Sequence, residues 1–283
     1  MESQPIKVDS KEVGLAVGLV LGEGLLNMED LHYGYWTEGL RIGLPQFAEA
    51  QEKYSHFLIS HIPAGVKTIL DVGSGAGKQV ARLLEKGYEV DCVSPNAYLT
   101  QRLQRVLNGK GTIYPCKFEE MKTDKKYDMV LFSESFQYVD TRVAIPKAAL
   151  LLNPGGYLMI SDFFKRSNLP DNGPLGGGHD FDPFCRFMDQ SAFAREADLD
   201  ITAQTAPTME MFGRTLNDVV SPVKDMVCDF VSYRHPYLSK FLAWKLKKRF
   251  RKINDKYFSG QLSGENFARY KTYRFLLYRL KNA

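Results

Sequence analysis

The chain has few of the features that mark secreted, metal-binding or membrane-spanning proteins. It holds four cysteines among 283 residues, and none of them forms a C-x-x-C pair, so neither a zinc site nor a disulfide framework is indicated. Residues 13–26 are apolar, but they include four glycines and Glu23 and are too short to span a bilayer. We interpret them as a helix that covers a pocket, with a membrane-surface role as the alternative. The first four residues lack Lys and Arg, unlike a signal peptide, and we predict a cytoplasmic location.

The sequence also lacks internal repeats, long low-complexity tracts and a cluster of metal-ligating side chains, so no metal is predicted. Its 44% hydrophobic and 25% charged content is ordinary for a folded domain and too apolar for a disordered chain. The net charge of +4 favours no partner, but it is unevenly spread. Residues 236–283 hold 13 Lys or Arg and 2 acidic residues, which leaves 24 basic and 31 acidic residues in the rest of the chain.

Short apolar runs alternate with helical patterns through the middle of the chain. The runs lie at 68–72, 89–93, 112–115, 127–132 and 157–164, and helical spacing occurs at 79–84, 99–107 and 142–152. This order predicts an α/β fold with a doubly wound, mostly parallel sheet and right-handed crossovers. A glycine-rich loop at 168–179 follows, and we expect it over the carboxyl edge of the sheet, where ligands bind in such folds.

The last third of the chain is predicted to add two strands separated by a helical insertion. Residues 191–197 have a helical pattern, 200–205 are predicted as a sixth strand, and 271–280 alternate like a final strand. About 60 residues between two strands are too many for a bare loop. We therefore expect one domain, 1–283, with an N-terminal helical lid (1–62), a cofactor-binding core (63–206), a helical substrate cap (207–269) and the final strand (270–283).

The sharpest local feature is an apolar run that leads into three glycines at alternate positions. Asp71 lies near the end of the run, and Gly73, Gly75 and Gly77 follow. A dinucleotide fingerprint needs glycine at position 78, where lysine stands, and a P-loop needs glycine at 72 and Ser or Thr at 79, where valine and glutamine stand. A carboxylate here would repel a pyrophosphate and favour a cation. S-adenosylmethionine, with a sulfonium, an ammonium and no phosphate, satisfies this requirement.

This turn resembles that of the class I S-adenosylmethionine-dependent methyltransferases, in which an acidic residue and G-x-G-x-G follow the first strand. The resemblance extends over about residues 65–165 and implies a seven-stranded sheet. Residues 31–36, Leu-His-Tyr-Gly-Tyr-Trp, are similar to a segment of small-molecule methyltransferases of the tocopherol, sarcosine and natural-product types, which have the cyclopropane fatty-acid synthases as relatives. The resemblance implies that this aromatic segment closes over the cofactor and that Tyr33 meets the methionine carboxylate, while Trp36 supplies an apolar wall.

The resemblance places the cofactor contacts at the carboxyl ends of the first four strands. Ser94 stands where an acidic residue usually holds the ribose hydroxyls, and Asp91, the alternative, should point away. Lys117 stands where an acidic residue often meets adenine, so we expect the amide and ring of Phe118 there instead. The expected cofactor-binding residues are Tyr33, Asp71, Gly73, Ser74, Gly75, Gly77, Ser94, Pro95, Asn96, Phe118, Glu119 and Ser133.

Methyl transfer is an in-line displacement at a carbon that the sulfonium has already activated. A general base is needed only when the acceptor must lose a proton, and the candidates are His179, His32, Tyr138 and Glu134. The aromatic residues of the cap predict a small, largely apolar acceptor, ring-bearing or acyl. The alternatives are a fatty-acyl or lipid enzyme of the cyclopropane-synthase type at a membrane, and a protein that binds S-adenosylmethionine without catalysis.

Residues 237–257 predict a basic amphipathic helix, in which eight Lys or Arg side chains alternate with apolar ones. Such a helix suits an anionic lipid or an acidic carrier protein. A cap helix with one solvated face is the alternative. We expect no nucleic-acid partner, because no RNA-binding module is recognisable.

Overall fold

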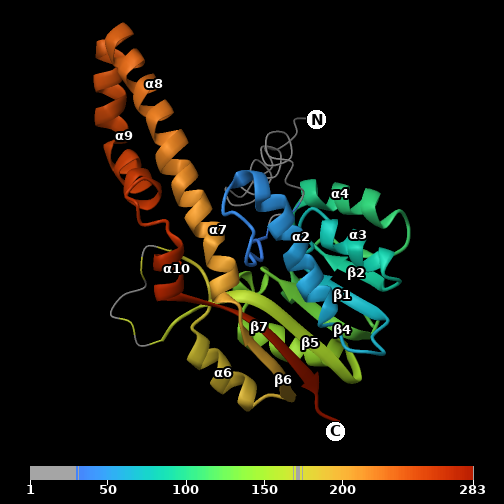
Figure 1. Ribbon diagram of the computed structural model, residues 1–283. Coiled ribbons are helices and arrows are strands. Elements are labelled where there is room, and N and C mark those ends of the chain that lie inside the picture. The colour runs from blue at the N-terminus through green and yellow to red at the C-terminus, as the bar shows by residue number, and fades with distance from the viewer. Residues whose placement is uncertain (1–29, 31, 168, 170–172, 174, 283) are drawn as a thin grey trace, which may run out of the picture.

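A seven-stranded sheet forms the centre of the computed structural model, which describes residues 30, 32–167, 169, 173 and 175–282 (Figure 1). The helix predicted at 13–26 lies outside the described residues. The strands follow the order β3-β2-β1-β4-β5-β7-β6, and β7 alone runs antiparallel to the other six. They are β1 (Thr68–Val72), β2 (Glu89–Val93), β3 (Ile113–Tyr114), β4 (Tyr127–Ser133), β5 (Leu152–Lys165), β6 (Phe193–Asp200) and β7 (Lys271–Leu280). The predicted fold class is confirmed.

Helices cover both faces of this sheet, so the central strands are apolar on both sides. One face packs against α2 (Leu44–Ser60), α3 (Lys78–Glu85), α4 (Ala97–Leu107), α7 (Thr202–Thr215) and α10 (Gly264–Tyr270). The other packs against α5 (Thr141–Leu151), α6 (Phe181–Asp189) and the short 3-10 helices Phe118–Glu120 and Phe136–Tyr138. Neighbouring residues of β1 alternate between the two cores: Ile69 belongs to the first and Leu70 to the second. This alternation is the period of a strand.

The chain between β5 and α7 differs from the prediction. Residues 191–197, expected to be helical, lie mostly in β6, and residues 202–205, expected in the sixth strand, begin α7. Helix α6 was not predicted. Strand β6 is an edge strand in which Phe193 is the only fully buried side chain, so it shows no alternation of apolar residues. Its Ala, Arg and Glu residues favour a helix, but pairing with β7 overrides this preference.

The insertion between β6 and β7 is helical, as predicted. It consists of α7, a π-helical turn (Leu216–Val220), α8 (Ser221–Arg234), α9 (Pro236–Tyr257) and α10. Figure 1 shows that α7 and α10 lie against the body, whereas α8 and α9 rise away from it as a hairpin. We call residues 216–257 the arm. The role of the whole insertion as a substrate cap stays a prediction.

Helix α7 meets the start of α10 at very close range through Gly213. A Cβ atom on Gly213 would lie 1.8 Å from the carbonyl oxygen of Leu262. No side chain fits there without moving the backbone, so this glycine fixes how the base of the insertion packs.

We predict that Gly213→Ala lowers the free energy of unfolding by about 1–3 kcal/mol, the usual cost of overpacking. In an unobstructed helix the same change would stabilise the protein by about 1 kcal/mol. Urea unfolding followed by circular dichroism measures the difference. Gly176→Ala is the matched control, because a Cβ there meets nothing within 4 Å. Increased stability of the Gly213 variant would contradict the close approach.

Candidate functional site

A cleft of about 560 Å³ opens at the carboxyl ends of β1, β2 and β4. The turn after β1, the start of α4 and the segments after β3 and β4 line it, together with the aromatic segment. All twelve residues expected to bind the cofactor lie along this one cleft: Tyr33, Asp71, Gly73, Ser74, Gly75, Gly77, Ser94, Pro95, Asn96, Phe118, Glu119 and Ser133. Their individual contacts stay predictions.

The three glycines of the turn all have positive φ, at +81°, +52° and +90°, a region that side chains disfavour. They differ in what surrounds them. A Cβ on Gly73 would lie 2.4 Å from the Cβ of Ser135, and one on Gly77 would lie 3.1 Å from Leu103. A Cβ on Gly75 would meet nothing within 4 Å, and Gly75 lines the cleft. Gly73 and Gly77 thus allow close packing, whereas Gly75 leaves the backbone open to a ligand.

Asp71 brings a buried carboxyl group to the same turn. Its side chain is only 2% exposed, and Oδ2 has no hydrogen-bond partner among the described residues. The hydroxyl of Ser74 donates to the main-chain oxygen of Asp71 at 2.9 Å. Burial raises the pKa of Asp71 to about 7, although a hydrogen bond from the Ser74 side chain opposes the shift. A buried polar atom without a partner is costly, and a cationic ligand in the cleft would satisfy it.

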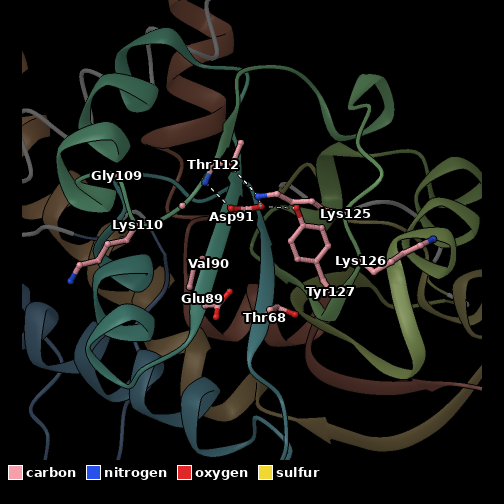
Figure 2. A pocket seen from close by; sticks show the side chains of 11 residues that line it. Thr68, Glu89, Val90, Asp91, Gly109, Lys110, Thr112, Lys125, Lys126 and Tyr127 are labelled. Carbon is pink, nitrogen blue, oxygen red and sulfur yellow. Dashed lines mark hydrogen bonds and ion pairs between the residues drawn. The ribbon is translucent and has the colours of Figure 1, made fainter.

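The end of β2 supplies hydroxyl and amide groups and no carboxylate. Ser94 is buried, and Asn96 Oδ1 accepts the Leu99 N–H at 3.0 Å, which caps α4. Asp91 does point away, as expected. Figure 2 shows Asp91 in a separate hollow, where its carboxylate accepts bonds from Thr112 N–H, Lys125 Nζ and Tyr127 Oη. It therefore stabilises the opposite edge of the sheet.

Glu134 joins three distant parts of the chain beneath the cleft. Its Oε1 accepts the Tyr33 N–H at 2.7 Å and the Tyr273 hydroxyl at 2.6 Å. The Tyr273 hydroxyl lies 2.8 Å from that of Tyr54, which donates to Ser161 Oγ at 2.8 Å. Glu134 also has a φ of +54°, which is unusual for a residue with a side chain and concentrates at functional sites. Burial raises its pKa to about 7, although the nearby His32 opposes the shift.

His32 lies in the cleft wall with both ring nitrogens engaged. Nδ1 lies 2.8 Å from the Tyr33 carbonyl oxygen, and Nε2 lies 3.3 Å from Ser55 Oγ and 3.4 Å from Asp30 Oδ1. Burial opposes a charge on this imidazole, but the carboxylates of Asp30 and Glu134 outweigh it and raise the pKa. To act as a base, His32 would have to give up one of these contacts. The contacts instead hold the aromatic segment, to which His32 belongs, in its position.

The other two candidates for catalysis occupy different places. Tyr138 lies at the rim of the cleft and is 65% exposed. His179 is not among the residues that line the cleft; its Nε2 lies 3.0 Å from the Phe136 carbonyl oxygen and its ring packs against that of Phe136. The glycine-rich loop thus holds His179 against the core. Trp36 is also outside the cleft lining, and its Nε1 donates to Thr208 Oγ1 at 3.0 Å on α7.

Sequence reasoning missed Tyr54 and Tyr273, which carry the hydrogen-bond network around Glu134. Both are fully buried. A signal existed on α2, where Gln51, Tyr54 and Ser55 interrupt the buried stripe with polar groups. Gln51 Nε2 donates to the carbonyl oxygens of Asp30 and His32 at 3.1 and 2.6 Å. Helix α2 thereby holds the aromatic segment in place.

Comparisons with known proteins agree with this geometry. Residues 46–199 match a methyltransferase domain family. The chain is 34% identical to an uncharacterized methyltransferase of Mycobacterium tuberculosis over 97 residues, which cover 34% of this chain and 40% of that protein. It is 28% identical to the malonyl-[acyl-carrier protein] O-methyltransferase of Anoxybacillus flavithermus over 127 residues, 43% of this chain and 49% of that protein. The matches therefore span less than half the length of these relatives.

Among solved structures, geranyl diphosphate C-methyltransferase from Streptomyces coelicolor has a TM-score of 0.65 at 15% identity, with 98% of this chain and 100% of that chain covered. The [4+2]-cyclase SpnF also has a TM-score of 0.65, at 16% identity and full coverage of both chains. These likenesses show the fold. The chain belongs to the methyltransferase domain family and has the class I fold, as its sequence predicts, and S-adenosylmethionine is the cofactor that this family and fold support.

Within the described ranges, no helix is long and apolar enough to cross a membrane. In the same part of the chain, no group of three or more His, Cys, Asp or Glu side chains is arranged to hold a metal ion.

We predict that Glu134→Gln makes stability less dependent on pH. Glu134 has a pKa of about 7 in the folded chain against an ordinary value of 4.5, so the folded state binds its proton more tightly. Protonation of Glu134 therefore stabilises the folded chain fully below pH 4.5, and this contribution is lost as the pH rises through 7. An amide keeps the acceptor oxygen and does not ionise, so the variant should lose about 2–3 kcal/mol less between pH 5 and pH 8.

Denaturant unfolding at the two pH values measures this difference. Glu85→Gln, at an exposed position on α3, removes the same charge and should follow the wild type. If the stability of the Glu134 variant and that of the wild type depended equally on pH, burial would not raise the pKa of this carboxyl group.

Proposed function

We propose that this protein transfers a methyl group from S-adenosylmethionine to a small, largely apolar acceptor. The observation that carries the proposal is Asp71 Oδ2, which has no hydrogen-bond partner among the described residues. Asp71 lines the same cleft as the open face of Gly75, in a chain that belongs to a methyltransferase family. A ligand with positive charge and without phosphate satisfies that oxygen, whereas a diphosphate would be repelled.

The residues around the cleft fit such a ligand. The turn at Gly73, Gly75 and Gly77 would hold its cationic portion against Asp71, and Ser94 would hold the ribose through its hydroxyl group. Phe118 would border the base. Bound S-adenosylmethionine supplies a methyl carbon that is already activated for displacement. The protein then has to exclude water and align the acceptor with this carbon. Such alignment can lower the activation free energy of a reaction by up to about 7–11 kcal/mol.

The far side of the cleft suits an apolar acceptor. Phe163, Val139 and Tyr33 line it, and the Tyr33 ring packs near those of Phe163 and Phe267 at 6.1 and 5.5 Å. Glu134 is the residue placed to accept a proton from an acceptor hydroxyl, because a base with a pKa near 7 is matched to neutral pH. Tyr33 N–H and Tyr273 Oη fix the position of its carboxyl group.

The relatives and structural neighbours do not determine the acceptor of this protein. One relative is an O-methyltransferase for a malonyl-[acyl-carrier protein], and one structural neighbour is a C-methyltransferase for geranyl diphosphate. Both acceptors have an apolar or acyl portion, which agrees with the cleft. SpnF has the same fold and is named as a cyclase, so binding of the cofactor and turnover have to be measured separately.

We predict that Gly75→Ala weakens binding of S-adenosylhomocysteine at least tenfold, because the methyl group enters the open face of the turn. Isothermal titration calorimetry measures the affinity. Gly87→Ala is a close control: Gly87 has a φ of +89° and equally open surroundings, but it lies outside the cleft lining. Both variants should lose similar stability, about 1–2 kcal/mol. Unchanged affinity in the Gly75 variant would contradict the placement of the cofactor.

We further predict that incubation with S-adenosylmethionine and a panel of acceptors releases S-adenosylhomocysteine. Apolar phenols and acyl thioesters should support turnover, and polar amino acids should not. Liquid chromatography with mass spectrometry measures both products. Tight binding of S-adenosylmethionine without turnover on any acceptor would favour a non-catalytic binding protein, and turnover on the polar members alone would overturn the acceptor class.

A further inference from the structure

The arm exposes large apolar side chains that the body does not cover. On α8, Val223, Val227 and Phe230 follow one another at intervals of four and three residues, the spacing of one helix face, and they are 52%, 56% and 66% exposed. Met226 and Tyr233 beside them are 63% and 89% exposed. An apolar stripe of this length on a helix that projects from the body (Figure 1) marks an interaction surface.

Aromatic rings gather at the free end of the arm, where α8 passes into α9. Tyr237 is 88% exposed, Phe241 50% and Trp244 75%. The rings of Phe241 and Trp244 lie 6.2 Å apart. Together with Phe230 and Tyr233, they give the two helices of the hairpin five exposed aromatic side chains near this end, and we call these five residues the tip.

Positive charge is concentrated on α9, whereas α8 carries the exposed Asp225 and Asp229. Helix α9 contains eight Lys or Arg residues and a single acidic residue, Asp255. Lys240, Lys245, Lys247 and Lys248 are exposed, and they lie among or just after the aromatic positions of this helix. Aromatic rings with a dense set of basic residues are the composition of helices that lie in the headgroup region of an anionic bilayer.

The arm is joined firmly to the body and to the edge of the cleft. Helix α7, the π-helical turn and α8 follow one another without a break, since the residues at both junctions, Leu216 and Val220, are themselves helical. At its root, Thr208 on α7 accepts the Gly34 N–H at 3.1 Å and the Trp36 Nε1–H at 3.0 Å. An arm bound to a surface would thus hold the aromatic segment, and with it the cleft, at a fixed distance from that surface.

A bilayer fits these features better than another protein does. A second copy of the arm would bring two strongly basic α9 helices together, and like charges oppose this contact. An acidic carrier protein would match the charge of α9, but its charged surface would not pair with five exposed aromatic rings. A fluid bilayer accepts aromatic side chains in any detailed arrangement, and its anionic headgroups match the lysines of α9.

We propose that the arm binds the surface of an anionic lipid bilayer, with the aromatic rings of its tip among the headgroups and the lysines of α9 facing the lipid phosphates. This binding does not depend on the proposed methyl transfer. It adds a surface at which the enzyme would meet an acceptor dissolved in, or attached to, lipid.

Trp244 provides a direct test, because the chain has two tryptophans and the other, Trp36, is 6% exposed. Full-length protein is titrated with vesicles of phosphatidylcholine alone or with 30% phosphatidylglycerol. We expect a blue shift of the fluorescence and co-sedimentation with the anionic vesicles only. The Trp244→Phe variant should still co-sediment but lose the blue shift, which would assign the signal to the tip.

A charge reversal tests the basic face. Lys245→Glu/Lys247→Glu/Lys248→Glu should lower the partition coefficient for anionic vesicles at least tenfold. The control is Lys86→Glu/Lys110→Glu/Lys122→Glu, which makes the same change in charge at exposed positions of the body and should reduce binding much less. Affinity for S-adenosylhomocysteine should be unchanged in both, which shows that the cleft remains folded.

Two outcomes would overturn the proposal. The first is absence of binding to anionic vesicles by the wild-type protein, and the second is equal loss of binding in the arm and body variants. In the first case, a stable dimer in sedimentation velocity that the arm variant dissociates, or a complex with an acyl carrier protein that it abolishes, would assign the tip to a protein partner.

Discussion

A buried carboxylate oxygen with no partner in the described part of the chain is the constraint on which the account depends. Asp71 lies near the end of β1, a central strand between β2 and β4, and its side chain is buried. The glycine turn beyond it leaves a face open at Gly75. Burial of a charge is expensive unless it is paired, so this turn favours a ligand that brings positive charge. The same arrangement disfavours a diphosphate, although the fold is close to that of dinucleotide-binding sheets.

A second buried carboxyl group organises the opposite wall of the cleft. Glu134 receives a main-chain N–H from the aromatic segment and a hydroxyl group from β7, so it connects segments that are more than 100 residues apart. The positive φ of Glu134 is strain that this packing maintains. The position of the aromatic segment and the protonation state of Glu134 are therefore linked through one side chain. The cleft thus has the glycine turn with the buried carboxyl group of Asp71 on one side, and Glu134 among aromatic and apolar side chains on the other.

Much of this could be predicted from the sequence, because the signals were local. Strands β1, β2 and β7 begin and end where the apolar pattern placed them, and the glycine turn identified the cleft. The failures arose where long-range contacts decided the outcome. Strand β6 is a strand because β7 pairs with it, and Tyr54 and Tyr273 meet across 219 residues of sequence. His179 could not be placed, because whether a loop histidine faces the cleft or the core depends on packing such as its contact with Phe136.

The most direct measurement is a crystal structure of the protein with S-adenosylhomocysteine. The account predicts the ligand in the cleft against the turn at Gly75, with Asp71 Oδ2 bonded to the ligand or to a water molecule that the ligand orders. A dinucleotide retained from expression at this turn would contradict the account. So would a ligand bound elsewhere that leaves the carboxylate of Asp71 without a partner.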